Sequence, residues 1–166
     1  MAVCGGRDAL RTPSVSDGPA GERAAALIAR LGLAPHPEGG WYRETWRVAA
    51  EDSGRGPATA ILFLLEAGQR SHWHRVDADE LWLWHAGATL ALSIAADSSP
   101  SATIALGGDV LGGEAPQHLV PAHAWQSAEA HAGWALVSCV VSPAFEFARF
   151  ELAPPGWAPV LQSPAA

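Results

Sequence analysis

Residues 68–87 read GQRSHWHRVDADELWLWHAG. Residues two apart on a strand point to the same face, so a strand through His72 and His74 would present two imidazoles roughly 6 to 7 Å apart. The polar residues 76–79 suit a turn, after which Glu80 opens an antiparallel strand beside the histidines. The segment therefore predicts that two histidines and a carboxylate meet at one point, a donor set that suits a divalent metal ion such as Zn, Mn, Fe or Ni.

The rest of the chain is divided into short segments by 17 glycines and 13 prolines, and 49% of its 166 residues are hydrophobic, as in a folded domain. Residues 22–31 have high helix propensity and end at Gly32. The apolar run 59–65 predicts a strand buried on both faces. The predicted strands are 41–48, 59–65, 71–75, 80–85, 90–95, 103–106, 118–120, 124–127, 134–141 and 147–152. One helix followed by about ten short strands predicts a single-domain, all-β jelly roll.

The chain ends differ in composition from this domain. Residues 1–19 mix small and polar side chains without a period, which predicts a flexible tail, followed by a domain over 20–155 and a C-terminal tail over 156–166. The first residues lack the apolar stretch of a signal peptide, and no later run approaches 18 apolar residues. We therefore expect a cytoplasmic protein without a membrane partner.

Charge and composition narrow the possible chemistry. The chain has 17 acidic and 10 basic residues, a net charge of −7, with no cluster of arginines and no lysine at all. This argues against a nucleic-acid partner and excludes a lysine Schiff base. The two cysteines, Cys4 and Cys139, are far apart in sequence, so we expect no disulfide; Cys139 lies in an apolar run typical of a small buried side chain.

The histidine segment resembles the first motif of the cupins, with Gly68, His72, His74, Glu80 and Gly87 at the motif positions. The similarity extends to one branch, DUF985 (Cupin_5), through HPEGGWYRE, WH, DELW, PAHAWQ and VSPAFEF at residues 36–44, 73–74, 79–82, 121–126 and 141–147. The resemblance covers about residues 27–152. It implies an RmlC-like double-stranded β-helix, usually dimeric, with a pocket in the barrel, and it implies no established reaction.

Candidate site residues follow from the motif and from strand parity. Gln126 stands where the second cupin motif has a histidine, and its carbonyl oxygen is a candidate fourth metal ligand. Tyr42 is the only tyrosine, and Arg43 and Glu44 point to opposite faces of one strand, so only one of those two can enter a pocket. The candidate catalytic residues are His72, His74, Glu80 and Tyr42. The candidate metal ligands are His72, His74, Glu80 and Gln126. The candidate substrate-binding residues are Glu38, Arg43, Trp82, Trp84, Trp125 and Glu146.

Several functions fit these residues. The first is a small-molecule enzyme in which a divalent metal ion polarises an oxygen of a sugar-like or hydroxy-acid substrate during isomerisation or epimerisation. The same donors also suit an Fe-dependent dioxygenase. Alternatively, a histidine assisted by a carboxylate removes a proton next to a carbonyl without metal, and Tyr42 or a second histidine returns one. A non-catalytic binding or storage protein is a further alternative. We expect a homodimer that associates through an apolar outer sheet face.

Overall fold

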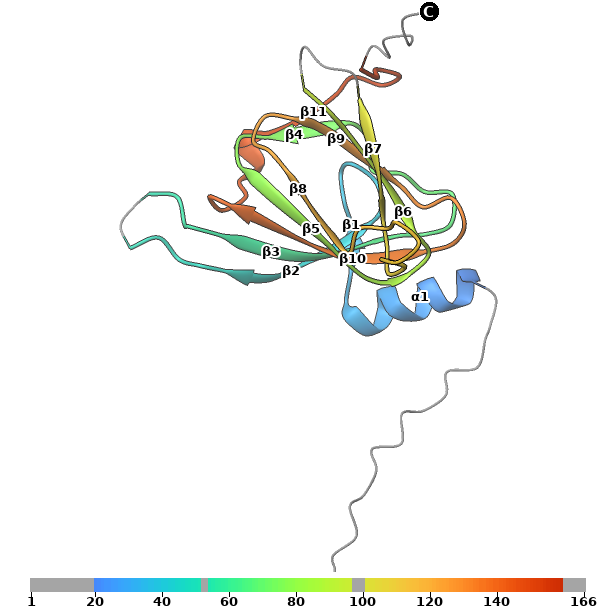
Figure 1. Ribbon diagram of the computed structural model, residues 1–166. Coiled ribbons are helices and arrows are strands. Elements are labelled where there is room, and N and C mark those ends of the chain that lie inside the picture. Colours follow the sequence, from blue (N-terminus) through green and yellow to red (C-terminus); the bar gives the residue numbers. More distant parts are fainter. Residues whose placement is uncertain (1–19, 52–53, 97–100, 160–166) are drawn as a thin grey trace, which may run out of the picture.

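The computed structural model describes residues 20–51, 54–96 and 101–159. Two antiparallel sheets face each other, and a single helix lies against one end of the fold (Figure 1). The elements are α1 (Ala20–Leu31), β1 (Ala34–Pro35), β2 (Trp41–Arg47), β3 (Thr59–Leu65), β4 (His74–Val76), β5 (Asp79–Gly87), β6 (Leu90–Ala95), β7 (Ala102–Leu106), β8 (Gln117–Val120), β9 (Trp125–Glu129), β10 (Ala135–Ser142), the 3₁₀ turn η1 (Phe147–Arg149) and β11 (Phe150–Leu152). The predicted all-β jelly roll with one N-terminal helix is confirmed.

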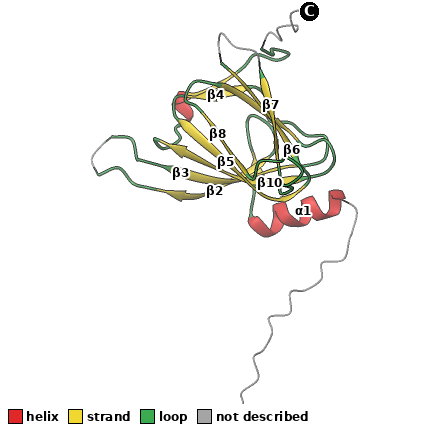
Figure 2. Cartoon of the chain, in the orientation of Figure 1, coloured by secondary structure: helices red, strands yellow, loops and turns green. Residues whose placement is uncertain are grey.

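The two sheets enclose one main core. One sheet has the order β1-β2-β3-β10-β5-β8 and the other β11-β4-β9-β6-β7, so that strands distant in sequence become neighbours (Figure 2). Inward residues of both sheets pack together, and the rings of Phe63 and Trp82 meet edge to face at 5.9 Å. Because alternate residues of β3 and β10 face this core, their other faces point outward.

The helix forms where propensity predicts it and begins two residues earlier. Its apolar stripe, which includes Ala24, Leu27 and Ile28, packs on Leu64 from the outer side of the six-stranded sheet. Gly32 ends the helix with φ of +63°, a conformation that glycine adopts without a steric penalty. No helix in the described ranges is long and apolar enough to cross a membrane.

Three local predictions differ from the structure. The strand predicted at 71–75 begins at His74, because the preceding residues are bonded across the fold: the His72 amide donates to the Glu38 carbonyl at 2.6 Å. The segment 147–152 starts with a 3₁₀ turn, closed by the Arg149 amide on the Glu146 carbonyl, before β11 begins. The strand β3 is not buried on both faces, since residues 60–62 are only half-buried.

The ends of the chain are described only in part. The tail predicted at 1–19 lies outside the described residues, and of the segment 156–166 only residues 156–159 are described. Within that part, the Trp157 ring packs 4.4 Å from the ring of Trp125 and against Trp73. The packed domain therefore includes Trp157.

Candidate functional site

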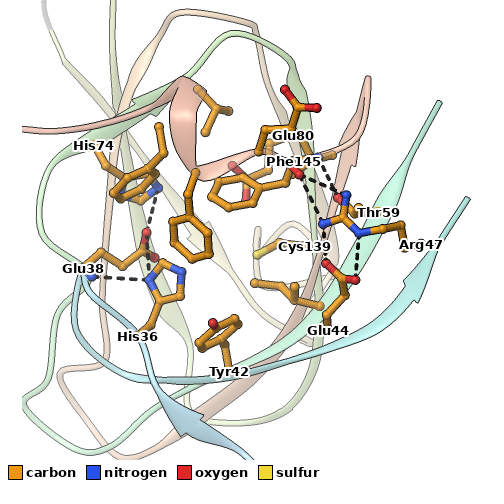
Figure 3. A pocket seen from close by; sticks show the side chains of 16 residues that line it. His36, Glu38, Tyr42, Glu44, Arg47, Thr59, His74, Glu80, Cys139 and Phe145 are labelled. Atoms are coloured by element: carbon orange, nitrogen blue, oxygen red, sulfur yellow. Dashed lines mark hydrogen bonds and ion pairs between the residues drawn. The ribbon is translucent and has the colours of Figure 1, made fainter. Parts of the chain in front are cut away.

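A cavity of about 480 Å³ lies inside the barrel, within the size range of small-molecule sites (Figure 3). Its walls come from the six-stranded sheet, from β4 and from the segment that carries η1. The lining residues are His36, Glu38, Tyr42, Glu44, Arg47, Thr59, Ile61, His74, Val76, Glu80, Cys139, Val141, Phe145, Glu146, Phe147 and Phe150. The cavity thus joins a polar inner wall to an aromatic one.

A tight turn carries Glu38 into this cavity. The amide of Gly39 bonds the His36 carbonyl and the amide of His36 bonds the Gly40 carbonyl, both at 3.0 Å. Gly40 has φ of +74°, and a Cβ atom there would lie 2.7 Å from a methyl carbon of Leu65. The Gly-Gly pair is therefore needed to close the turn and to bury the Glu38 carboxyl.

Glu38 lies between two imidazoles. Its Oε2 atom is 3.4 Å from Nδ1 of His36 and 3.4 Å from Nε2 of His74 (Figure 3). The Nδ1 atom of His74 is 2.8 Å from the carbonyl oxygen of His72, which can only accept, so Nδ1 carries the hydrogen and Nε2 presents a lone pair to Glu38. Nδ1 of His36 accepts from the backbone N–H of Glu38. While both imidazoles are neutral, a hydrogen bond from the Glu38 carboxyl to either nitrogen requires a proton on Glu38.

The burial of these groups favours the same protonation state. Burial lowers the pKa of His74 to about 4 and that of His36 to about 4, because water no longer solvates the imidazolium. Burial also raises the pKa of Glu38 well above its usual value, and the nearby Glu80 carboxyl adds to this effect. Burial therefore favours neutral imidazoles and the protonated form of the Glu38 carboxyl over an ion pair.

A second buried carboxyl lies on β5. Glu80 accepts a hydrogen bond from Nε2 of Gln126 at 2.6 Å, and Oε1 of Gln126 accepts one from Nε1 of Trp82 at 2.9 Å. Burial raises the pKa of Glu80, although the bonds from Gln126 and from the Cys139 thiol oppose the effect. The amide of Gln126 is therefore oriented by partners on both of its sides.

Replacing Gln126 with leucine should destabilise the fold by about 2 kcal/mol, because the Trp82 N–H and the Glu80 carboxyl would be left buried without this partner. Urea unfolding at pH 7 measures the change. The matched control is Gln117→Leu, which alters the same side chain at an exposed position of β8 and should change stability by less than about 0.5 kcal/mol. Equal losses in the two variants would contradict the assigned role of the Gln126 amide.

The structure separates the four predicted metal ligands. His74 and Glu80 line the cavity, whereas the His72 ring lies outside the lining and its Nε2 is 3.3 Å from the carbonyl oxygen of Pro154. Strand parity does not apply to the two histidines, because the strand begins only at His74. Gln126 is fully buried behind Glu80, and its carbonyl oxygen is already used by Trp82.

Some of the other candidate residues line the cavity and others lie elsewhere. Glu38, Tyr42 and Glu146 line the cavity, and Glu44 enters it from β2 in place of Arg43, which is exposed on the opposite face. The three tryptophans do not line it. Trp82 is buried in the main core, Trp84 packs against that core, and Trp125 belongs to the separate cluster with Trp73 and Trp157. Indoles that were expected to form pocket walls are thus used in packing.

Sequence reasoning missed four polar residues of the cavity: His36, Arg47, Thr59 and Cys139. His36 has no ligand-like spacing to another histidine, so its spacing gives no sign of a place in the cavity. Cys139 is buried, as predicted, but its thiol faces the cavity from β10, where it pairs with Trp82. Strand parity could have found Cys139, since it is two residues from both Val137 and Val141 on the inward face.

The donor arrangement does not fit a bound divalent metal ion. Within the described part of the chain, no group of three or more His, Cys, Asp or Glu side chains is arranged to hold one. His74 and His36 each direct one ring nitrogen at the same Glu38 oxygen, and the other predicted nitrogen donor, His72, lies outside the cavity. We therefore derive no chemical step through a metal ion.

Adding Zn, Mn, Fe or Ni to metal-stripped protein should change its Tm by less than about 1 °C. A specific site loaded at a hundredfold excess over its Kd would stabilise the fold by about 2.7 kcal/mol, which is about 5 °C or more for a chain of this size. Differential scanning fluorimetry at increasing metal concentration measures this. A saturable rise in Tm that is lost in His72→Ala would contradict the donor arrangement described above.

Two antiparallel sheets folded over an internal cavity define the class of this protein, which is a cupin. The chain belongs to the Cupin_5 family, described as Cupin superfamily (DUF985), whose model matches residues 25–153. No curated protein matches the chain.

Solved structures share this fold. Protein SO0799 from Shewanella oneidensis is 42% identical, with 78% of this chain and 84% of that chain covered and a TM-score of 0.73. A hypothetical protein from Leishmania major is 35% identical, with 77% and 85% covered and a TM-score of 0.71. Oxalate decarboxylase from Bacillus subtilis is 16% identical over 71% of this chain and 29% of that chain, with a TM-score of 0.57, a likeness of fold alone.

Proposed function

We propose that this cupin binds a small carbonyl compound and moves a proton on the carbon next to the carbonyl without a metal ion, as an epimerase or isomerase does. The observation that carries the proposal is the 3.4 Å contact, inside the cavity, between the His74 imidazole, which burial holds neutral, and the Glu38 carboxyl, whose protonated form burial favours. A base and an acid with pKa values moved apart by their surroundings are typical of proton-transfer sites.

The proposed step uses both members of this pair. His74 Nε2 takes the proton from the substrate carbon while Glu38 gives its proton to the carbonyl oxygen, which leaves a neutral enol. The imidazolium and carboxylate that result lie 3.4 Å apart and stabilise each other. Tyr42, which lines the cavity beside His36 with ring centres 4.5 Å apart, is the proposed donor of a proton to the other face of the carbon, while Glu38 recovers its proton from the enol oxygen. His74 then releases its proton to solvent and the Tyr42 phenolate takes one from solvent, which restores the site.

The experiment is proton exchange with solvent. Metal-stripped protein is incubated in D₂O with a panel of aldoses, ketoses, lactones and 2-hydroxy acids, and NMR detects deuterium on the carbon next to the carbonyl. We expect enzyme-dependent exchange for at least one compound that persists in the presence of a chelator. Exchange that requires added metal would instead support a metal-dependent isomerase or an Fe enzyme. The absence of exchange across the panel would favour a non-catalytic binding protein.

We also propose that the protein forms a homodimer through the outer face of the six-stranded sheet. The register aligns Trp46, Ala60, Val140, Leu81 and Leu119 as successive cross-strand neighbours on β2, β3, β10, β5 and β8. Trp46 is 52% exposed and Leu119 is 50% exposed. Two copies with a net charge of −7 repel each other, and an uncharged apolar row lets identical faces meet with the least repulsion.

Light scattering after gel filtration should therefore give twice the chain mass for the wild type and the chain mass for Leu81→Glu, which places a charge within the row between Val140 and Leu119. The matched control is Leu152→Glu on β11 of the other sheet, where the side chain is 40% exposed, and it should remain dimeric. A wild type that is monomeric at tens of micromolar would contradict this interface.

A further inference from the structure

Charged side chains are distributed unevenly around the cavity. Four of its lining residues are glutamates: Glu38, Glu44, Glu80 and Glu146. Arg47 is the single arginine among the described lining residues, and the chain has no lysine. Neither buried carboxyl carries a positive charge in any protonation state, so any charge attraction for a negatively charged ligand from an arginine or lysine of the described lining depends on Arg47.

The guanidinium of Arg47 is already occupied. Its Nε and Nη2 atoms bond the two carboxylate oxygens of Glu44 at 2.9 and 2.6 Å, and Nη1 and Nη2 each contact the Phe145 carbonyl oxygen at 3.2 Å (Figure 3). The two-pronged contact that a guanidinium would make with a ligand carboxylate or phosphate is made with Glu44 instead. Arg47 thus fixes the segment bearing Phe145 and contributes no free positive charge.

The arginines just outside the cavity are also paired with acids. Nη1 of Arg55 and Nη1 of Arg149 bond the Asp77 carboxylate at 3.1 and 3.0 Å, and Nε of Arg149 bonds Glu146 at 2.9 Å. Neither Arg55 nor Arg149 lines the cavity. The charges around the opening are therefore balanced within the protein before any ligand arrives.

An apolar cluster lies directly beside the two imidazoles, with the Phe150 ring 5.5 Å from the His74 ring and the Phe147 ring 6.1 Å from the His36 ring. Phe145, Phe147 and Phe150 lie together, with ring centres 4.9 to 6.3 Å apart, and Phe147 is 53% exposed. Ile61 and Val141 add apolar lining from β3 and β10. Such a surface favours the C–H face of a ring, while the hydroxyl and carbonyl groups of that ring face His36, Glu38 and His74.

We propose that the cavity selects an uncharged ring compound that bears hydroxyl and carbonyl groups, such as a free aldose or its lactone, and rejects the corresponding carboxylates and phosphate esters. This assignment rests on the proposed function, because it names the substrate class of the same site. The sequence was compatible with either a sugar-like or a hydroxy-acid substrate. The proposal favours the sugar-like compounds.

Binding of matched probes tests this selection without requiring catalysis. Ligand-observed NMR compares glucose, galactose and xylose and their lactones with the aldonates and terminal phosphates of the same sugars. We expect at least one neutral compound to bind at least tenfold more tightly than its acid and its phosphate. An anionic member that binds as tightly as its neutral counterpart, or no binding by any neutral member, would overturn the proposal.

A charge-restoring variant provides a second measurement. Glu44→Gln removes the carboxylate from Arg47 and should improve binding of the aldonates and phosphates at least fivefold relative to binding of the neutral compounds. The control is Glu151→Gln, which releases Arg75 from a 2.7 Å ion pair outside the cavity and should leave anion binding unchanged. Equal effects of both variants would overturn the role given to Arg47. Neutral selectivity without deuterium exchange would remove the proposed catalysis and leave the ligand class standing.

Discussion

The His74→Ala variant is expected to lose at least 100-fold in the rate of solvent proton exchange into the substrate carbon. A positioned general base contributes about 10²–10⁴-fold, and His74 Nε2 is the proposed base, one of the two imidazole nitrogens that face the Glu38 carboxyl. The measurement is the rate of deuterium incorporation followed by NMR, together with Tm to verify that the variant folds. A His74→Ala protein that is folded and exchanges as fast as the wild type would remove His74 as the base.

The matched control is His72→Ala, two residues earlier in the chain. Because the His72 ring lies outside the cavity lining, near the Pro154 carbonyl, its exchange rate should stay within about threefold of the wild type. A metal centre built on both histidines predicts the opposite, namely that the two variants lose activity equally. The pair of variants therefore distinguishes proton transfer by His74 from metal ligation by His72 and His74.

The alternation of side chains along a strand predicts which face a residue occupies only where the residue lies on a regular strand. The prediction was therefore correct on β5 and wrong for the segment before β4. Glu80 and Trp82 lie on one regular strand, so their shared inward face could be predicted from their spacing. His72 and His74 have the same spacing, but His72 precedes the strand and its amide is bonded to Glu38, 34 positions away in the sequence. Such a long-range bond leaves no local signal in the sequence, so the conformation of His72 could not be predicted.

The contact between Glu38 and His74 also depends on long-range structure. The residues His36 and Glu38 fall within a segment that resembles the Cupin_5 branch, and the Gly-Gly pair after them predicts a turn. Their approach to His74 depends on the chain between them closing two sheets around a cavity. Residue types and the fold could thus be predicted from sequence, whereas the pairing that gives Glu38 and His74 their chemistry required the three-dimensional arrangement.

The burial of His74 also has a consequence for stability. In the unfolded chain a histidine titrates near its ordinary pKa of 6.5, whereas burial lowers the pKa of folded His74 to about 4. Between these two values the unfolded chain binds more protons than the folded protein, so acidification favours unfolding. We expect His74 to remove about 3 kcal/mol of stability as the pH falls from 7 to 4. The raised pKa values of Glu38 and Glu80 act in the opposite direction, because their protonated forms are favoured in the folded protein.

A difference measurement isolates the histidine from these opposing groups. Urea unfolding is followed at several pH values between 4 and 7 for the wild type and His74→Asn, so that contributions common to both proteins, including that of His36, largely cancel. The wild type should lose about 3 kcal/mol more than the variant over this range. His131→Asn, which alters an imidazole whose side chain is 65% exposed, should retain the wild-type dependence. Parallel curves for the wild type and His74→Asn would mean that His74 is not held neutral in the folded protein, and the base proposed for proton transfer would lose its physical foundation.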